Sequence, residues 1–157
     1  MNTPQMQRSD ALTFLKAHSC GSLATVSAEG TPRVRTLYYS CDDSLSVYLL
    51  TLANTRKVSD MHSHPQAAFV VTDTEKNQTL QIEGVFEEIT DTATFGPMLS
   101  ELTSRLFPEG KPSAPITHMD AAKPLLFKLV PTWIRFGDFS ETNASKEAFS
   151  SVLQSDT

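Results

Sequence analysis

Three residues at the start of a predicted helix have side chains that bind anions. Thr55, Arg56 and Lys57 open a helix-like segment that follows the apolar, strand-like run 45–51 and extends to Ser63. The N-terminus of a helix carries positive partial charge, so two cations in its first turn are unfavourable unless something negative lies nearby. An anionic group there would meet backbone N–H groups, a hydroxyl, a guanidinium and an ammonium. A local anion site is therefore one interpretation of this spacing.

The strand before this run adds further cations. Arg33 and Arg35 are two residues apart in the predicted strand 32–39, so both guanidiniums are expected on one face of it. If this strand pairs antiparallel with the next one across the turn 41–44, Arg35 and Thr51 lie near the same end of the hairpin. Four donor residues would then converge where the strand leads into the helix.

A second interpretation needs no ligand. Arg56 and Lys57 would face solvent, and Arg35 would pair with a surface carboxylate such as Asp42 or Asp43. Spacing alone leaves both interpretations open.

Other catalytic motifs are missing from the sequence. The six glycines are scattered singly, which argues against a Rossmann or P-loop nucleotide site, and no Gly-x-Ser-x-Gly or Cys-x-x-Cys occurs. The histidines at 18, 62, 64 and 118 form no i,i+4 ligand pair, so no metal site is expected. The carboxylates in 83–88 are expected on a solvated strand face. We therefore assign no catalytic side chain from the sequence.

Composition indicates one globular domain over residues 1–157, with a flexible tail from about 141. The chain has 39% hydrophobic residues and a net charge of −5, which argues against general binding to nucleic acids or anionic membranes. It shows no signal peptide and no apolar run long enough for a membrane span, so a cytoplasmic location is expected.

Hydrophobic patterning predicts a mainly β fold. Six or so strands, most of them joined by hairpins and with helices inserted after the third and fifth, imply an antiparallel barrel with peripheral helices. Gly84 predicts a bulge or bend, Pro131 a bend in the last strand, and Pro108 to Pro115 a surface loop. The predicted strands are 23–27, 32–39, 45–51, 67–72, 79–89 and 125–136, and the predicted helices are 9–18, 55–63 and 91–106.

Three segments together resemble a known family. GSLATVSAEGTPRVRTLYY, VYLLTLANTRKVSDMHSHPQAAFVV and TLQIEGVFEEI, at their separations here, resemble the flavin-binding split-barrel proteins related to pyridoxamine 5'-phosphate oxidase. The match covers about residues 12–90 and, more loosely, 125–137. The resemblance implies a six-stranded antiparallel split β-barrel that binds FMN, and a homodimer with the cofactor at its interface.

The resemblance also implies cofactor-binding roles for particular residues. Those along the flavin ring and ribityl chain are Arg35, Thr36, Leu37 and Tyr38, with Arg35 beside the pyrimidine edge. Those that hold the phosphate are Thr51, Thr55, Arg56 and Lys57. Gln81, or else Gln78, would contact the cofactor from the partner subunit. Trp133 would pack on the flavin or the partner, or else serve as an ordinary core or interface tryptophan.

The implied function is that of an FMN-dependent oxidoreductase of unknown substrate, such as an NAD(P)H-dependent flavin or quinone reductase, with a small-molecule electron donor and acceptor. The alternative is a stress-related protein that binds or senses flavin, F420 or haem without turnover. The vitamin B6 oxidase itself has an Arg-x-His element near its C-terminus. The corresponding end here, FKLVPTWIRFGDFS, has none, so vitamin B6 oxidation is not expected.

Overall fold

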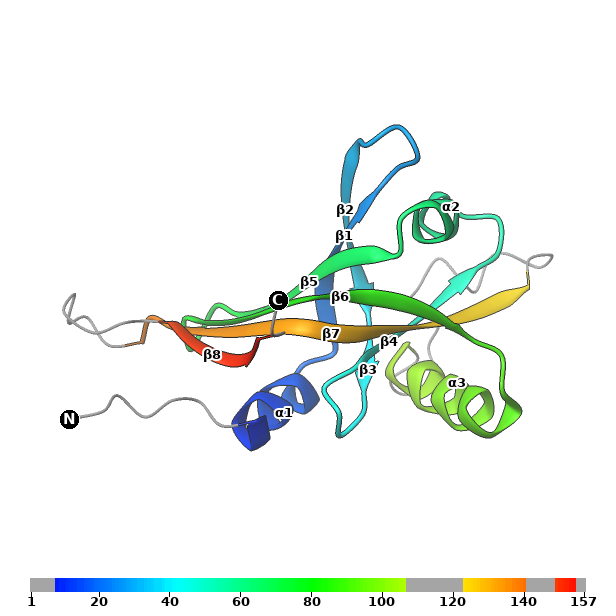
Figure 1. Ribbon diagram of the computed structural model, residues 1–157. Helices are drawn as coiled ribbons and strands as arrows, with labels where there is room; N and C mark the ends of the chain where they lie inside the picture. The colour runs from blue at the N-terminus through cyan, green and yellow to red at the C-terminus, as the bar shows by residue number, and fades with distance from the viewer. Residues whose placement is uncertain (1–7, 107–122, 141–148, 155–157) are drawn as a thin grey trace.

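The protein is described here by a computed structural model, which describes residues 8–106, 123–140 and 149–154. The predicted surface loop 108–115 and residues 141–148 of the predicted tail lie outside these ranges. Within them, three helices surround one antiparallel sheet (Figure 1). The helices are α1 (Arg8–Ala17), α2 (Arg56–Ser63) and α3 (Thr92–Leu106). The strands are β1 (Cys20–Val26), β2 (Pro32–Tyr38), β3 (Ser40–Cys41), β4 (Val47–Leu52), β5 (Gln66–Asp73), β6 (Gln78–Ile89), β7 (Pro124–Asp138) and β8 (Phe149–Gln154).

The sheet curls back on itself to form a split barrel. Its strand order is β2-β1-β5-β6-β7-β4-β3, and β8 pairs with β7 beside this path. Only Tyr39 separates β2 from β3, so the strands at the two ends of the path are continuous in the chain. The predicted antiparallel split barrel is therefore confirmed.

The predicted number of six strands is wrong. The path has seven strands. The segment predicted as one strand over 32–39 ends at Tyr38 in the structure, and the chain then forms the additional strand β3, which pairs with β4. The predicted hairpin across 41–44 is limited to this short β3–β4 pair, although β2 still passes close to β4. An eighth strand comes from the tail, where residues 149–154 form β8 on β7.

The core lies inside the curl of the sheet. Leu23, Phe69, Ile82 and Phe127 are each at most 2% exposed and come from four different strands. Strand β4 is buried on both faces, because α3 covers its outer side with a second, smaller cluster. That second cluster is built on Tyr48, Leu102 and Leu126.

A bulge between β6 and β7 confirms the prediction made from Gly84. The register shifts at Gly84, and Thr132 is the extra residue on β7. Inward-facing residues of β7 therefore change from odd positions, such as Leu129, to even ones, such as Ile134. The shift turns Trp133 toward the outer face of the sheet.

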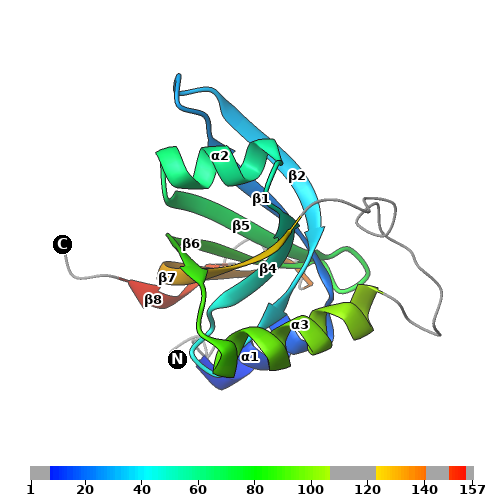
Figure 2. The same ribbon diagram turned by 90° about the vertical axis from the view of Figure 1, so that its right-hand side faces the viewer.

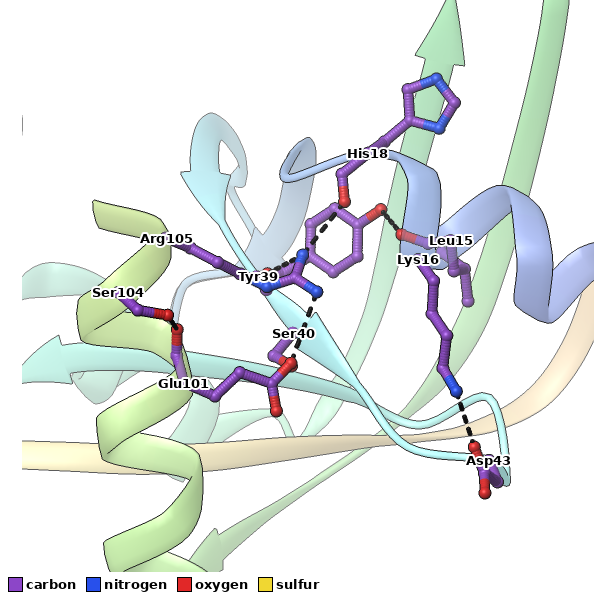
Figure 3. Close-up of polar contacts among 9 residues, drawn as sticks. All are labelled: Leu15, Lys16, His18, Tyr39, Ser40, Asp43, Glu101, Ser104 and Arg105. Atoms are coloured by element: carbon purple, nitrogen blue, oxygen red, sulfur yellow. Dashed lines mark hydrogen bonds and ion pairs between the residues drawn. The ribbon is translucent and has the colours of Figure 1, made fainter. Parts of the chain in front are cut away.

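The helices lie on two sides of the barrel. Figure 2 shows α2 on one side and α1 and α3 on the other. In Figure 3, Arg105 of α3 donates to the carbonyl oxygens of His18 and Tyr39, at 3.2 and 3.4 Å, and to Glu101 at 3.4 Å. Glu101 also accepts a hydrogen bond from Ser40. These bonds join α3 to the point where β2 leads into β3. No helix in the described ranges is long and apolar enough to cross a membrane.

Candidate anion-binding site

The start of α2 has no side-chain cap. Thr55 occupies the N-cap position in an extended conformation, but its hydroxyl donates to the carbonyl of Leu52 at 2.9 Å instead of capping the helix. The same hydroxyl lies 3.2 Å from that of Thr51, which is 3% exposed. The first turn of the helix also contains no acidic residue. The positive end of α2 is therefore available to an anion.

Arg35 is electrostatically coupled to three other cations at this junction. Burial lowers the pKa of Lys57, and the positive charge of Arg35 lowers it further. Burial also lowers the pKa of Arg35; Asp60 opposes this effect, whereas Arg33 and Arg56 add to it. Such mutual effects require the charges to be close together. The two strand arginines and the two helix cations thus share one electrostatic neighbourhood.

A buried carboxylate that the sequence analysis did not consider lies beside these cations. Asp60 of α2 is 2% exposed and accepts hydrogen bonds from Arg33 at 2.7 Å and from the Thr25 hydroxyl at 2.9 Å. Arg35 approaches the same carboxylate at 3.5 Å and donates to the Thr25 oxygen at 2.7 Å. Both arginines therefore lie on one face of β2, as their alternation predicts, and this face points inward, where they bind α2.

The cluster keeps a surplus of positive charge. Among the described residues, Asp60 pairs with two of the four cations, Arg33 and Arg35, and no carboxylate pairs with Arg56 or Lys57. The buried Nε of Arg33 has no hydrogen-bond partner. A chain with a net charge of −5 thus has a strongly cationic spot at the start of α2. Such a spot suits a small, multiply charged anion.

The structure brings five of the ten predicted site residues together. They are Thr51, Thr55, Arg56 and Lys57 at the β4–α2 junction, and Arg35 of β2, which lies beside α2. The surface pairing considered for Arg35 is wrong. Asp43 pairs with Lys16, and Asp42 pairs with Lys128 and Tyr48, whereas Arg35 pairs with Asp60.

The other predicted residues lie elsewhere on β2 or on the outer face of the sheet. Leu37 points inward and packs against the core, whereas Thr36 and Tyr38 point outward. Gln81 and Trp133 also lie on the outer face, on β6 and β7. Gln78 bonds instead to Asp138 at 3.1 Å.

Arg135 of β7 contacts both Gln81 and Trp133 on the outer face of the sheet. Arg135 donates from Nη2 to the Gln81 side-chain oxygen at 2.8 Å. Its guanidinium carbon lies 4.1 Å from the ring centre of Phe149 in β8 and 5.2 Å from that of Trp133. Stacking and hydrogen bonding together fix the orientation of Gln81.

A match to a family model shows which protein family the chain belongs to. The family model described as pyridoxamine 5'-phosphate oxidase matches residues 9–136, well over half of the chain. The protein belongs to the pyridoxamine 5'-phosphate oxidase family. A search of curated proteins finds no match.

Solved structures with the same fold have several functions. An FMN-binding protein related to pyridoxamine 5'-phosphate oxidase, from Nostoc punctiforme, is 18% identical, with a TM-score of 0.59 over 91% of this chain and 92% of its own. An F420 reductase is 25% identical, with a TM-score of 0.62 over 78% and 93%. A haem-binding protein from Mycobacterium smegmatis is 15% identical, with a TM-score of 0.66 over 98% and 60%. These likenesses support the split-barrel fold.

In this family member, Asp60 is the main site residue that the sequence analysis missed. A signal for it exists, because Asp60 lies among Val58 and Met61 on the buried side of a short amphipathic helix. A lone carboxylate on an apolar helix face needs a buried partner, and Arg33 and Arg35 were the available cations.

The described residues contain no group of three or more potential metal ligands. His18 is bonded to the Phe14 carbonyl and to Asp73, and His62 is bonded to Glu88.

Proposed function

We propose that the protein binds FMN, with the phosphate at the start of α2, and acts as an oxidoreductase with a small-molecule electron donor and acceptor. The observation that carries this proposal is the cation cluster of Arg35, Arg56 and Lys57 beside an uncapped helix start. NAD(P)H-dependent reduction of a flavin or quinone is the reaction that we propose.

The donor set fits a phosphate monoester. An FMN phosphate carries nearly two negative charges at neutral pH, which the guanidinium and ammonium groups would offset. The Thr51 and Thr55 hydroxyls are already bonded to each other, and Thr55 also donates to the Leu52 carbonyl. The neutral donors that remain for a phosphate are therefore the first amides of α2. Bound FMN would supply hydride and electron transfer, which needs no nucleophilic side chain.

The neighbours of Arg35 support a role at the phosphate. The resemblance placed this residue beside the pyrimidine edge of the flavin, but its charge couples to Arg56 and Lys57 at the helix start. We therefore assign its guanidinium to the phosphate end of the cofactor.

We further propose a homodimer whose partner subunit completes the site. Gln81 and Trp133 lie on the outer face of the sheet, so each would reach a flavin held at the junction of a second copy. Arg135 has only donors, so the Gln81 oxygen must face it and the amide N–H groups remain for another acceptor. Val34 of β2 also points outward and is 72% exposed, so it is an apolar side chain that a partner subunit would cover.

The alternative is a binding or sensing protein for F420 or haem without turnover. The similar structures named for those ligands support it. His18 is unsuitable as a haem ligand, because both of its ring nitrogens are already bonded, one to the Phe14 carbonyl and one to Asp73.

The absorption spectrum of the purified protein tests the proposal. We expect flavin bands that bleach under anaerobic conditions when NADH or NADPH is added and return with an acceptor. A Soret band, a deazaflavin spectrum or apoprotein that does not take up FMN would contradict FMN binding. Bound FMN that neither nicotinamide reduces would contradict the proposed reaction and favour the binding protein.

FMN affinity should decrease as the pH rises into the alkaline range. Burial and Arg35 lower the pKa of Lys57 below 10.5, so its ammonium loses its proton earlier than an exposed lysine would. Because only the charged form attracts phosphate, FMN binding should weaken as the pH passes through this lowered pKa. Titrations with FMN between pH 7 and roughly 10.5 measure the effect.

The variant Lys57→Arg provides the control for this prediction, because arginine stays charged over the whole range. Its FMN affinity should be nearly independent of pH. Equal pH dependence in both proteins would show that another group titrates.

A further inference from the structure

Asp60 is the buried counter-ion of two arginines rather than one. Its Oδ1 accepts from Arg33 at 2.7 Å, and its Oδ2 faces Arg35 at 3.5 Å and Thr25 at 2.9 Å. Figure 2 shows that these residues come from elements that meet, because α2 lies against the β1–β2 hairpin.

The Thr25 hydroxyl links Arg35 to Asp60, because it accepts a hydrogen bond from the first and donates one to the second. Thr25 is 1% exposed, and its single proton is donated to Asp60. Its lone pairs are then available to Arg35, whose Nη1 donates to it at 2.7 Å. Arg35 is thus held at both terminal nitrogens, one through Thr25 and one by the carboxylate directly.

Packing of α2 alone does not explain this arrangement. A buried carboxylate is costly to desolvate, and an apolar residue would hold the helix at lower cost. One arginine would be enough to neutralise Asp60, yet a second one is held there with its charge close to Lys57 and Arg56. The network therefore fixes a cation beside the start of α2.

We propose that Asp60 is a positioning residue that, with Thr25, holds the Arg35 guanidinium at the phosphate position. The phosphate monoester of the ligand would then meet a fixed donor rather than a mobile side chain. This inference rests on the proposed function, because it assigns the phosphate to the same junction.

The ratio of FMN affinity to riboflavin affinity is the quantity that tests this proposal. The two ligands differ only in the phosphate, so a general loss of fold stability affects both alike. Removing Asp60 also removes a negative charge, which by itself favours an anion. The effect of Asp60→Asn alone is therefore not decisive, and the test is a double-mutant cycle with Arg35→Met.

In otherwise unchanged protein, Arg35→Met should lower the ratio of FMN to riboflavin affinity about tenfold, as for loss of a charge-assisted hydrogen bond. In the Asp60→Asn background, the same change should lower it by about twofold or less, because Arg35 is no longer held in place. Flavin fluorescence quenching gives both dissociation constants. Equal effects of Arg35→Met in the two backgrounds would overturn the proposal.

Two further variants complete the test. Asp43→Asn makes the same chemical change at an exposed carboxylate and should leave the effect of Arg35→Met at about tenfold. If Asp60→Asn does not fold, the cycle is run with Thr25→Val, in which the effect should fall to roughly threefold; an unchanged tenfold effect there would overturn the proposal.

The starting protein separates this inference from the proposed function. If it binds riboflavin as tightly as FMN, the phosphate assignment fails and the role of Asp60 fails with it. If it prefers FMN but the two changes act independently, only the role of Asp60 fails.

Discussion

Replacing Arg56 and Lys57 together by alanine is expected to weaken FMN binding by about 100-fold or more and to leave riboflavin binding unchanged. Each side chain supplies a charge-assisted hydrogen bond, and two such bonds contribute about 3 to 5 kcal/mol together. Arg56 is exposed and Lys57 partly buried, so neither change removes core packing. Isothermal titration with both flavins measures the effect.

The double variant Lys16→Ala/Lys76→Ala is the matched control. It removes the same charge from two exposed positions away from the start of α2. Its FMN affinity should stay within about threefold of the original value, because exposed charges at a distance are screened by salt. If both double variants bind FMN equally well, the phosphate does not lie at this helix start.

Replacing Gly84 by alanine is expected to cost about 3 kcal/mol of unfolding free energy and to lower the Tm by roughly 6 to 12 °C. A Cβ at this position would lie 2.3 Å from the carbonyl oxygen of Val130. The obstacle is backbone in the neighbouring strand, so relief requires a shift of β7 against β6. Thermal unfolding followed by circular dichroism measures the loss.

Gly96→Ala provides the comparison. A Cβ at Gly96 would meet nothing within 4 Å. Alanine favours the helix by about 1 kcal/mol, but the following Pro97 disfavours helical backbone before it, so the two effects offset each other to within about 1 kcal/mol. Equal Tm values for the two variants would contradict the close approach at the bulge.

The sequence was sufficient to predict the three helices, most of the strands and the cations at the start of α2, because these features depend on local patterns. Alternation in β2 put Arg33 and Arg35 on one face, and the break after β4 put Thr55, Arg56 and Lys57 at a helix start. Each of these statements needs only a few neighbouring residues.

The features that sequence reasoning missed depend on contacts between distant segments. Asp60 pairs with arginines 25 and 27 residues earlier in the chain, and no periodic pattern specifies such a pairing. The predicted number of strands was wrong for a similar reason. Before Tyr39 the chain pairs with β1 as strand β2, and after it the chain pairs with β4 as strand β3. A segment that is continuous in sequence therefore forms the two end strands of the sheet.

The inward direction of the arginines on β2 has a consequence for solubility. Strand β2 ends the strand path, and β1 is its only partner among the described strands. An open strand edge can recruit a strand from another molecule, and inward-pointing charges are one of the means by which proteins prevent such pairing. Arg33 and Arg35 meet this description. Removing both should therefore promote edge-to-edge aggregation.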